Sequence, residues 1–279
     1  MAKENLSILY GYLNDKPKIY TDKEGNLKKA LFSLTVIRRF NTLNLNVTNN
    51  IRYDCVLVKT SNVEHIKEIA KLKSKDMVFV KGVLATLNVK KITRCPNCNK
   101  EHISIGSQVY VEPIFIETRE RNVQENEYIS LLQNNNEISN ILVCIGTLCR
   151  EPAYYRDEET GFNTIRYQLA VNRKYRVLED PAEKTTDYPW VKSFGNQAVK
   201  DCEKLHISSK ILIDGCLQAR EFLRKTECEC GEEYEWQDNT IEIVPYSIEY
   251  LSNCNMTEEE IQEEMINLQN AILAVKDEE

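Results

Sequence analysis

Four cysteines occur in two closely spaced pairs that have the chemistry of a metal site. Cys95-Pro-Asn-Cys98 is one pair, and Cys228-Glu-Cys230 is the other. A structural zinc ion takes four ligands in a tetrahedron, and thiolates are among its commonest ligands. Each pair offers two thiolates. The spacing therefore predicts a zinc ion held by all four cysteines, joining two distant segments within one chain or between chains.

Two alternatives to this site stay open at the level of sequence. His102, four residues after Cys98, is a further ligand type that could act with groups from elsewhere in the chain. The four cysteines could also be reduced thiols without a metal. Other cysteines lie in strand or helix patterns and are predicted to be buried, small apolar residues: Cys55, Cys144, Cys149, Cys202 and Cys216.

The two cysteine pairs occupy equivalent places in an internal repeat. Gly11-Tyr-Leu13 matches Gly146-Thr-Leu148 at a shift of 135 residues, and Phe32–Val36 matches Tyr167–Val171 at the same shift. Further on, the segment 78–84 matches 211–217 at a shift of 133, and Cys95 meets Cys228. Matches this regular indicate a duplicated fold.

Each copy is predicted to be mainly β. Residues 29–39 and 165–173 alternate apolar and polar side chains, which is typical of a half-buried strand. Further strands are expected at the start of each copy and at 53–59 and 188–194. A fourth strand in each copy is expected to end near Gly82 or Gly215, and a hairpin that carries the cysteines follows it. Short helices are expected at 62–72 and 197–205, and closing strands at 108–117 and 241–251.

Three strands, a helix and two more strands describe an OB-fold, a five-stranded Greek-key barrel. The fold class is therefore mainly β, with two tandem OB-fold barrels and a C-terminal helix. The predicted domains are a first barrel at 1–118, a polar linker at 119–138 with one helical turn near Tyr128, a second barrel at 139–252, and an acidic tail at 253–279. Thr257 and Glu260 form a capping box at the start of the tail helix.

Charge is distributed unevenly along the chain. Residues 1–117 hold 19 bases and 11 acids, residues 118–251 hold 16 and 24, and residues 252–279 hold one and eight. A basic first half suits a polyanionic partner. The sequence has no apolar run of about 18 residues and no secretory signal pattern, so no membrane span and a cytoplasmic location are expected. It also lacks the P-loop, the G-x-G-x-x-G motif and the nucleophile elbow, so an enzyme is not expected.

The second copy resembles bacterial-type single-stranded DNA-binding proteins. The residues that carry the resemblance are Asn140–Pro152, Tyr167–Arg173, Phe194–Ala198, Ile213–Arg220 and Ile241–Val244. The first copy keeps only Gly11-x-Leu13, Phe32-Ser-Leu34 and Gly82-x-Leu84 of this pattern. Members of the family bind single strands with little base reading, through aromatic rings that stack on bases and cations that pair with phosphates.

The resemblance places a set of binding residues on this chain. Its stacking positions fall at or near Tyr175, Tyr188, Phe194 and Phe222, with Tyr155 and Trp190 as neighbours, and its cations at Arg173, Lys174, Lys192 and Arg220. In the first copy only Phe40 and Tyr20 keep an aromatic ring. That copy instead carries cations, which are expected to neutralise phosphates: Arg38, Arg39, Arg52, Lys59, Lys81, Lys90, Lys91 and Arg94.

The expected function is therefore sequence-independent binding and protection of single-stranded DNA in replication, recombination or DNA transfer. Because the family presents four OB units per assembly, two units per chain predict a homodimer, and replication or recombination proteins are possible partners. The tail lacks the apolar tip by which the family recruits such proteins. Two alternatives are a protein-interaction adaptor and an RNA-binding OB protein.

Overall fold

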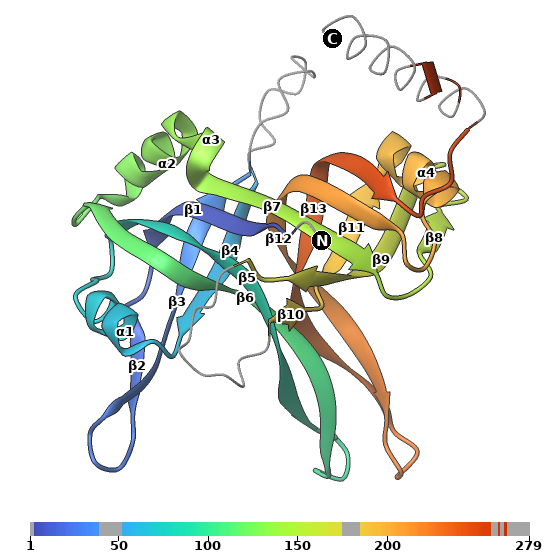
Figure 1. Cartoon of the computed structure of the whole chain (residues 1–279). Helices are drawn as coiled ribbons and strands as arrows, with labels where there is room; N and C mark the ends of the chain where they lie inside the picture. The colour runs from blue at the N-terminus through green and yellow to red at the C-terminus, as the bar shows by residue number, and fades with distance from the viewer. Residues whose placement is uncertain (1–2, 39–51, 175–184, 258–261, 263–264, 267–279) are drawn as a thin grey trace, which may run out of the picture.

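The computed structural model describes residues 3–38, 52–174, 185–257, 262 and 265–266. Two barrels lie side by side, and a pair of long hairpins projects from their junction (Figure 1). The elements of the first half are β1 (Asn5–Leu13), β2 (Lys18–Thr21), β3 (Leu27–Ile37), β4 (Tyr53–Thr60), α1 (Val63–Ile69), β5 (Met77–Arg94), β6 (Glu101–Glu120), α2 (Glu125–Asn134) and α3 (Asn136–Ser139). Those of the second half are β7 (Asn140–Leu148), β8 (Ala153–Arg156), β9 (Asn163–Asn172), β10 (Thr186–Asp187), β11 (Trp190–Phe194), α4 (Gly195–Lys204), β12 (Lys210–Glu227) and β13 (Glu233–Ser252).

Both halves close into five-stranded barrels of the same topology. In the first, β1 pairs with β3 and β5, β5 with β6, and β3 with β4. A parallel contact of Val58 with Val111 closes the ring between β4 and β6. In the second, β7, β9, β11, β13 and β12 repeat this order, and the parallel contact joins Val191 to Ile243. The prediction of an OB-fold is confirmed.

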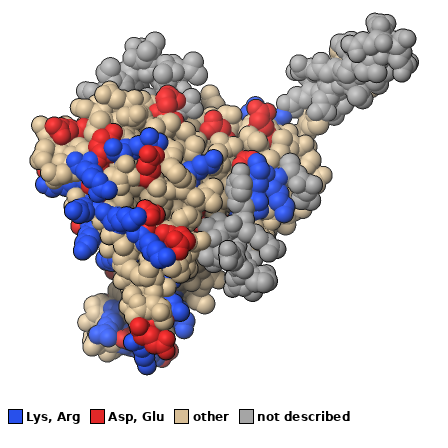
Figure 2. All heavy atoms as spheres, turned by 60° about the vertical axis from the view of Figure 1, so that its left-hand side comes forward, with Lys and Arg blue, Asp and Glu red and all other residues tan. Residues whose placement is uncertain are grey.

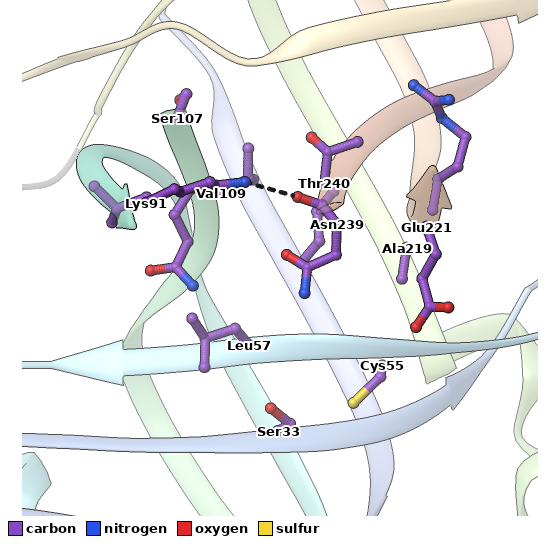
Figure 3. Close-up of a pocket in the computed structure, with 14 residues that line it drawn as sticks. Ser33, Cys55, Leu57, Lys91, Ser107, Val109, Ala219, Glu221, Asn239 and Thr240 are labelled. Atoms are coloured by element: carbon purple, nitrogen blue, oxygen red, sulfur yellow. Dashed lines mark hydrogen bonds between the residues drawn. The ribbon is translucent and has the colours of Figure 1, made fainter. Parts of the chain in front are cut away.

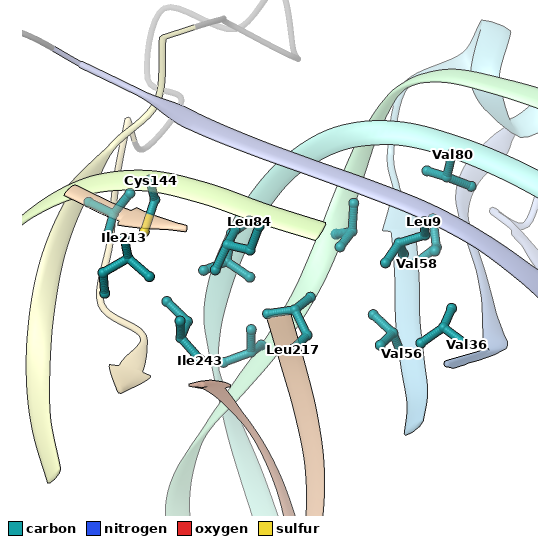
Figure 4. Close-up of a cluster of buried hydrophobic side chains, with 14 of the residues drawn as sticks. Leu9, Val36, Val56, Val58, Val80, Leu84, Cys144, Ile213, Leu217 and Ile243 are labelled. Atoms are coloured by element: carbon teal, nitrogen blue, oxygen red, sulfur yellow. The ribbon is translucent and has the colours of Figure 1, made fainter. Parts of the chain in front are cut away.

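The alternation of apolar and polar residues sets which side chains fill each barrel. Along β9, every second residue from Ile165 to Val171 is buried, while the residues between them are partly exposed. The buried side chains of both barrels form one apolar cluster that crosses the junction, with Leu9 and Val56 on one side and Ile213 and Ile243 on the other (Figure 4). Each fully buried Leu, Ile or Val of this kind stabilises the fold by roughly 1.5–3 kcal/mol.

The barrels are joined through their first strands. β1 and β7 pair antiparallel from Asn5, opposite Cys144, to Leu9, opposite Asn140. Ser7 lies opposite Leu142, which is its own counterpart in the repeat at a shift of 135. An approximate two-fold axis therefore passes through this pair of residues and relates the two barrels. The two barrels share one continuous sheet, so the chain has the form of a pseudo-dimer.

Two equivalent glycines bend the longest strands. A Cβ atom on Gly82 would lie 2.4 Å from the Glu112 carbonyl oxygen, and one on Gly215 would lie 2.4 Å from the Val244 carbonyl oxygen. The strand register shifts at both positions. Only glycine allows so close an approach between backbones, so it permits the barrel corner in each copy.

The sequence pattern predicts that the longest strands end near these glycines, but in the structure they continue beyond them. β5 continues for twelve residues beyond Gly82, pairing with β6 up to Arg94 opposite Glu101, and β12 continues in the same way to Glu227 opposite Glu233. Each barrel therefore extends into a two-stranded hairpin, which we call hairpin 1 (residues 86–109) and hairpin 2 (residues 219–241). Alternation of side chains persists along both, but a sequence pattern cannot say where a strand leaves the barrel.

The segment expected to be a linker is packed on the first barrel. The ring of Tyr128 in α2 stacks on Tyr12 with centroids 4.2 Å apart, and Leu132 is fully buried. Ser139 donates a hydrogen bond of 2.7 Å to the Tyr10 carbonyl oxygen. These contacts fix how the chain enters the second barrel. The predicted tail helix lies almost entirely outside the described residues.

Candidate nucleic-acid interface

The outer face of the second barrel carries a row of aromatic side chains. β9 pairs on one side with β8 and on the other with β11, so Thr164 has Tyr155 and Phe194 as its two neighbours. One step along the sheet, Lys192 lies beside Arg166. The alternation that buries Val191 and Ser193 turns Trp190, Lys192 and Phe194 outward. Strand pairing thus brings side chains from three segments onto one surface.

A ring that the sequence did not single out extends this row. Phe162 is 51% exposed, and its ring centroid lies 6.2 Å from that of Phe194. It ends a tight turn in which the backbone N–H of Asp157 donates to the Phe162 carbonyl oxygen and Gly161 takes a positive φ. Tyr155, 61% exposed, lines the same shallow pocket. The signal for Phe162 was an aromatic residue placed directly after a glycine turn between two strands.

Cations lie against the rings of this surface. The Arg166 guanidinium lies 4.1 Å from the centroid of Trp190, with Arg150 on the same ring at 5.9 Å. The Lys192 ammonium lies 5.3 Å from the ring of Phe194. Cation–ring contacts of this kind hold the rings in place and put positive charge beside flat apolar surface.

A buried carboxylate orders the arginines. Glu242 on β13 is 1% exposed and forms ion pairs with Arg166 at 3.3 Å and Arg220 at 3.1 Å. Arg220 in turn lies 4.8 Å from the ring centroid of Phe222. Glu242 therefore links the barrel face to hairpin 2, and both guanidinium groups retain exposed surface.

The aromatic row continues along hairpin 2. Arg224 lies between the rings of Phe222 and Trp236, at 5.6 and 5.9 Å. It is held by Asp238 at 2.8 Å, and the Trp236 indole N–H donates to the Thr226 hydroxyl at 3.0 Å. We call the whole surface the aromatic strip, defined by Tyr155, Phe162, Phe194, Trp190, Phe222 and Trp236. Trp236 and the cations Arg150, Arg166 and Arg224 were missed because sequence alone did not place them beside these rings.

Tyr188 lies where the two barrels meet. Its side chain is 47% exposed, and its backbone N–H donates to the Thr86 hydroxyl of hairpin 1 at 3.0 Å. The Gln168 amide donates to the Tyr188 carbonyl oxygen at 3.1 Å. The ring is thus available beside the strip, close to the base of hairpin 1.

One predicted cation, Arg173, is buried instead of exposed. Arg173 does not face solvent: its side chain is 7% exposed and pairs with Asp187 at 2.7 Å, because it sits at the end of β9 under the junction. Lys174 is exposed and pairs with Glu4 at 3.2 Å. Tyr175, Arg39 and Phe40 lie outside the described residues.

In the described residues of the first barrel, the matching face does not carry such an aromatic strip. Leu57 and Ser61 stand where Trp190 and Phe194 stand in the second barrel, at a shift of 133. Lys59 lies over the ring of Tyr110 at 4.5 Å, and burial lowers the pKa of its ammonium group. Figure 2 shows Lys and Arg side chains gathered over this barrel, with acidic groups among them.

The cations predicted for the first barrel differ in how exposed they are and in whether a carboxylate pairs with them. Arg38 pairs with the buried carboxylate of Asp54 at 2.9 Å. Lys91 is bound by Asp238 of hairpin 2 and donates to the Asn239 carbonyl oxygen at 3.3 Å. Lys90 is exposed on the other face of hairpin 1. Of these three, Lys90 has the most exposed setting.

The tips of the two hairpins meet at four cysteines, Cys95, Cys98, Cys228 and Cys230, which we call the cysteine clasp. The Sγ atoms of Cys95, Cys98, Cys228 and Cys230 all lie within 4.8 Å of one another, with Cys95 to Cys230 at 3.7 Å and Cys98 to Cys228 at 3.5 Å. Zinc–sulfur bonds of about 2.3 Å in a tetrahedron require sulfur atoms about 3.8 Å apart. The four thiols can therefore hold a metal ion within one chain.

Backbone groups favour the thiolate form of Cys95. The N–H groups of Cys98 and Asn97 point at the Cys95 sulfur and lower the pKa of that thiol to about 7. His102 Nε2 lies 3.1 Å from the Cys228 sulfur, so it sits beside the four-thiol cluster. At the tips Lys100 pairs with Glu229 at 2.5 Å, and below them the Thr93 and Tyr234 hydroxyls bond at 3.0 Å.

The remaining cysteines only partly follow the prediction that they are buried. Cys144 and Cys216 are buried, whereas Cys149 is half-buried. Cys55 and Cys202 are exposed, which corrects the prediction for both. Cys55 points outward from β4 between the inward residues Asp54 and Val56, and Cys202 lies on the outer side of α4.

Comparison with known proteins assigns the second barrel. Residues 139–242 match the sequence profile of the single-strand binding protein family. The second barrel is therefore similar to this family over nearly its whole length. The resemblance predicted from the motifs of the second copy is confirmed over these residues. No curated protein sequence matches the chain.

Two solved structures share the fold over both barrels. One is the wild-type single-stranded DNA binding protein from Thermus aquaticus, with a TM-score of 0.57 and 17% identity over 92% of this chain and 97% of that one. The other is a deletion mutant of the same protein, with a TM-score of 0.58 and 18% identity over 93% and 100%. None of the helices in the described part of this chain is long and apolar enough to cross a membrane.

Proposed function

We propose that this protein binds single-stranded DNA along the aromatic strip, without reading its sequence. The observation that carries the proposal is the strip itself, on the outer face of a barrel whose sequence matches the profile of the single-strand binding protein family. Every base has a flat π face, and stacking on an aromatic side chain contributes roughly 1–3 kcal/mol per base whatever the base is. The rings give affinity, and the arginines and lysines between them pair with phosphates.

The strand would follow the strip from Tyr155, Phe162 and Phe194, over Trp190, and onto hairpin 2 at Phe222. Arg166 and Arg220 share one carboxylate, so they are positioned in advance while keeping part of their guanidinium surface exposed. Preorganised cations lose little conformational entropy on binding. The first barrel would contribute mainly charge, through Lys90, Lys59 and the basic groups seen in Figure 2.

A fluorescence titration tests this proposal directly. The chain has two tryptophans, Trp190 and Trp236, and both belong to the strip. We expect oligo(dT) to quench their emission, with affinity that falls steeply as salt rises because phosphate contacts release counterions. Absence of binding at low salt would favour a protein-interaction adaptor, and tighter binding of oligo(rU) would favour an RNA-binding protein.

In the cell, we propose protection of exposed strands during replication, recombination or DNA transfer. Pairing of two chains would give four barrels, as the family resemblance implies. Analytical ultracentrifugation with and without oligo(dT) tests the homodimer: a sedimenting mass of a single chain at micromolar concentration would exclude it.

We also propose that the cysteine clasp binds zinc as a structural ion. The four thiols converge at distances that suit tetrahedral thiolate coordination. The ion would lock hairpin 1 to hairpin 2 and so hold Phe222 and Trp236 in place. Elemental analysis of the purified protein should give one zinc per chain, and a value near zero in protein purified without chelator would exclude the ion.

A further inference from the structure

A cavity of about 350 Å³ lies between the bases of the two hairpins, outside the aromatic strip. Its floor is the outer face of the first barrel, where Ser33, Cys55 and Leu57 point into it (Figure 3). Hairpin 1 gives one wall and hairpin 2 the other. The Lys91 ammonium reaches across the gap to the Asn239 carbonyl oxygen at 3.3 Å, so the two hairpins bridge over the floor.

The walls combine apolar surface with neutral polar groups. Val89 and Val109 come from hairpin 1, and Ala219 and Ile241 from hairpin 2. The amides of Gln108 and Asn239 and the hydroxyl of Ser33 line the same space. A volume of this size is at the lower end of the roughly 300–1,000 Å³ typical of small-ligand sites. The lining therefore suits a small, flat group with an edge of hydrogen-bond donors and acceptors.

Charge argues against a phosphate as the occupant. Of the two cations in the lining, Lys91 is paired with Asp238. Arg220 is paired with Glu242 and lies against the Phe222 ring of the aromatic strip, where we propose that it meets a phosphate of the stacked strand. The remaining charged group is the exposed carboxylate of Glu221, which would repel an anion. An aliphatic side chain fits poorly for another reason, because it would leave the amides and hydroxyls of the lining without partners.

The cavity opens next to the aromatic strip. Arg220 lines the cavity, and its guanidinium lies 4.8 Å from the ring centroid of Phe222. Arg220 also shares the Glu242 carboxylate with Arg166, which lies over the ring of Trp190. A strand stacked on the strip would thus pass the mouth of the cavity. Sites that accept an unstacked base typically hold it between apolar side chains and bond its polar edge.

We propose that this cavity takes one unstacked nucleobase of the bound strand, so the first barrel contributes a base site although its described residues form no aromatic strip. The inference rests on the proposed binding of single-stranded DNA. It assigns a role to both copies: the second barrel stacks successive bases, and the first barrel with both hairpins holds a single base turned out of that stack.

The exposed thiol of Cys55 in the floor reports occupancy. The full chain is labelled with N-ethylmaleimide, with and without saturating oligo(dT), and each cysteine is quantified by peptide mass spectrometry. We expect DNA to slow labelling of Cys55 severalfold and to leave Cys202, an exposed thiol on α4, unchanged. An oligomer of abasic deoxyribose of the same length, saturating at low salt, should leave Cys55 reactive.

The outcomes separate the base site from the proposed function. If oligo(dT) quenches tryptophan emission but Cys55 keeps its labelling rate, the base site is wrong and strip binding stands. Equal protection by the abasic oligomer would also overturn the base site, because the backbone alone would then cover the thiol. If oligo(dT) does not bind at all, the proposed function fails, and the base site fails with it.

A cavity-filling variant gives a second readout. Ser33→Leu adds an aliphatic side chain to the floor and should weaken oligo(dT) binding about tenfold, within what one stacked base contributes. Ser247→Leu makes the same change at an exposed position of β13 away from the cavity and should bind like the unchanged chain. Equal affinities of the two variants, both shown to be folded by circular dichroism, would contradict the proposal.

Discussion

The carboxylate of Asp187 in the second barrel accepts a hydrogen bond of 2.6 Å from the backbone N–H of Thr86 in the first hairpin. Arg173 holds the same carboxylate from the other side, with contacts of 2.7 and 3.1 Å. All three groups lie at the junction of the barrels. A buried ion pair therefore ties the base of hairpin 1 to the second barrel.

The same arrangement occurs on the other side of the approximate two-fold axis. Asp54 accepts a hydrogen bond of 2.9 Å from the Ala219 backbone N–H at the base of hairpin 2, and Arg38 holds it at 2.9 Å. Each aspartate thus belongs to one barrel and bonds the hairpin of the other. We call the two arrangements the junction latches. Because the latches are reciprocal, the base of each hairpin is bonded to both barrels.

Removing Asp187 should destabilise the protein strongly. Asp187→Ala leaves the Arg173 guanidinium buried without its carboxylate, which typically costs about 3–5 kcal/mol. Urea unfolding followed by circular dichroism measures the change in the free energy of unfolding. The double variant Arg173→Met with Asp187→Leu should recover much of the loss, since it removes both charges. Unfolding of Asp187→Ala at the same urea concentration as the unchanged chain would contradict the latch.

The latches show what the sequence could and could not predict. Alternating side chains and paired glycines were enough to predict both barrels, because these patterns depend on local backbone geometry. Arg173 was expected among the exposed binding cations, because the family resemblance placed it there. In the structure its partner Asp187 also accepts a hydrogen bond from Thr86, about ninety residues before Arg173, and no local pattern encodes that contact.

The site was predictable to a similar extent. Trp190, Lys192 and Phe194 follow from strand alternation together with the family resemblance. Phe162 and Trp236 join them only through pairing across the sheet and along hairpin 2. The four clustered cysteines were predictable from their equivalent positions in the repeat, because a two-fold axis brings equivalent hairpin tips together. The exposure of Cys55 could not be predicted from the sequence, because it depends on the open space between the two hairpins.

Tyr155 and Tyr20 form a matched pair for testing stacking. They are equivalent in the repeat and are 61% and 44% exposed, but only Tyr155 lies on the aromatic strip. Tyr155→Ala should weaken oligo(dT) binding about tenfold, the effect of losing one stacked base. Tyr20→Ala should change affinity less than about twofold, because loss of a ring outside the interface removes no stacking. Similar losses in both variants would contradict the assignment of stacking to the second barrel.

Lys192 should contribute to the salt dependence of binding. Its ammonium lies beside Phe194 on the strip, where a stacked strand would bring a phosphate. Lys192→Gln should reduce the slope of log affinity against log salt by about 1 and weaken binding similarly for all sequences. Lys67→Gln is the matched control, since Lys67 pairs with Glu64 on α1, away from the strip. An unchanged slope for Lys192→Gln would place this lysine outside the interface.

Removing one thiol from the clasp should release the metal and loosen the hairpins. Cys98→Ser leaves three thiolates, so zinc content should fall well below one per chain, and hydrogen exchange of the amides near Tyr234 and Trp236 should speed up. The barrels should stay folded, because their core does not include the tips. Cys202→Ser removes an exposed thiol elsewhere and should keep both the metal and the exchange pattern. If Cys98→Ser retained a full equivalent of zinc, coordination by all four thiolates would be wrong. If exchange near the tips did not change on loss of zinc, Lys91–Asp238 and Thr93–Tyr234 would be sufficient to hold the hairpins together.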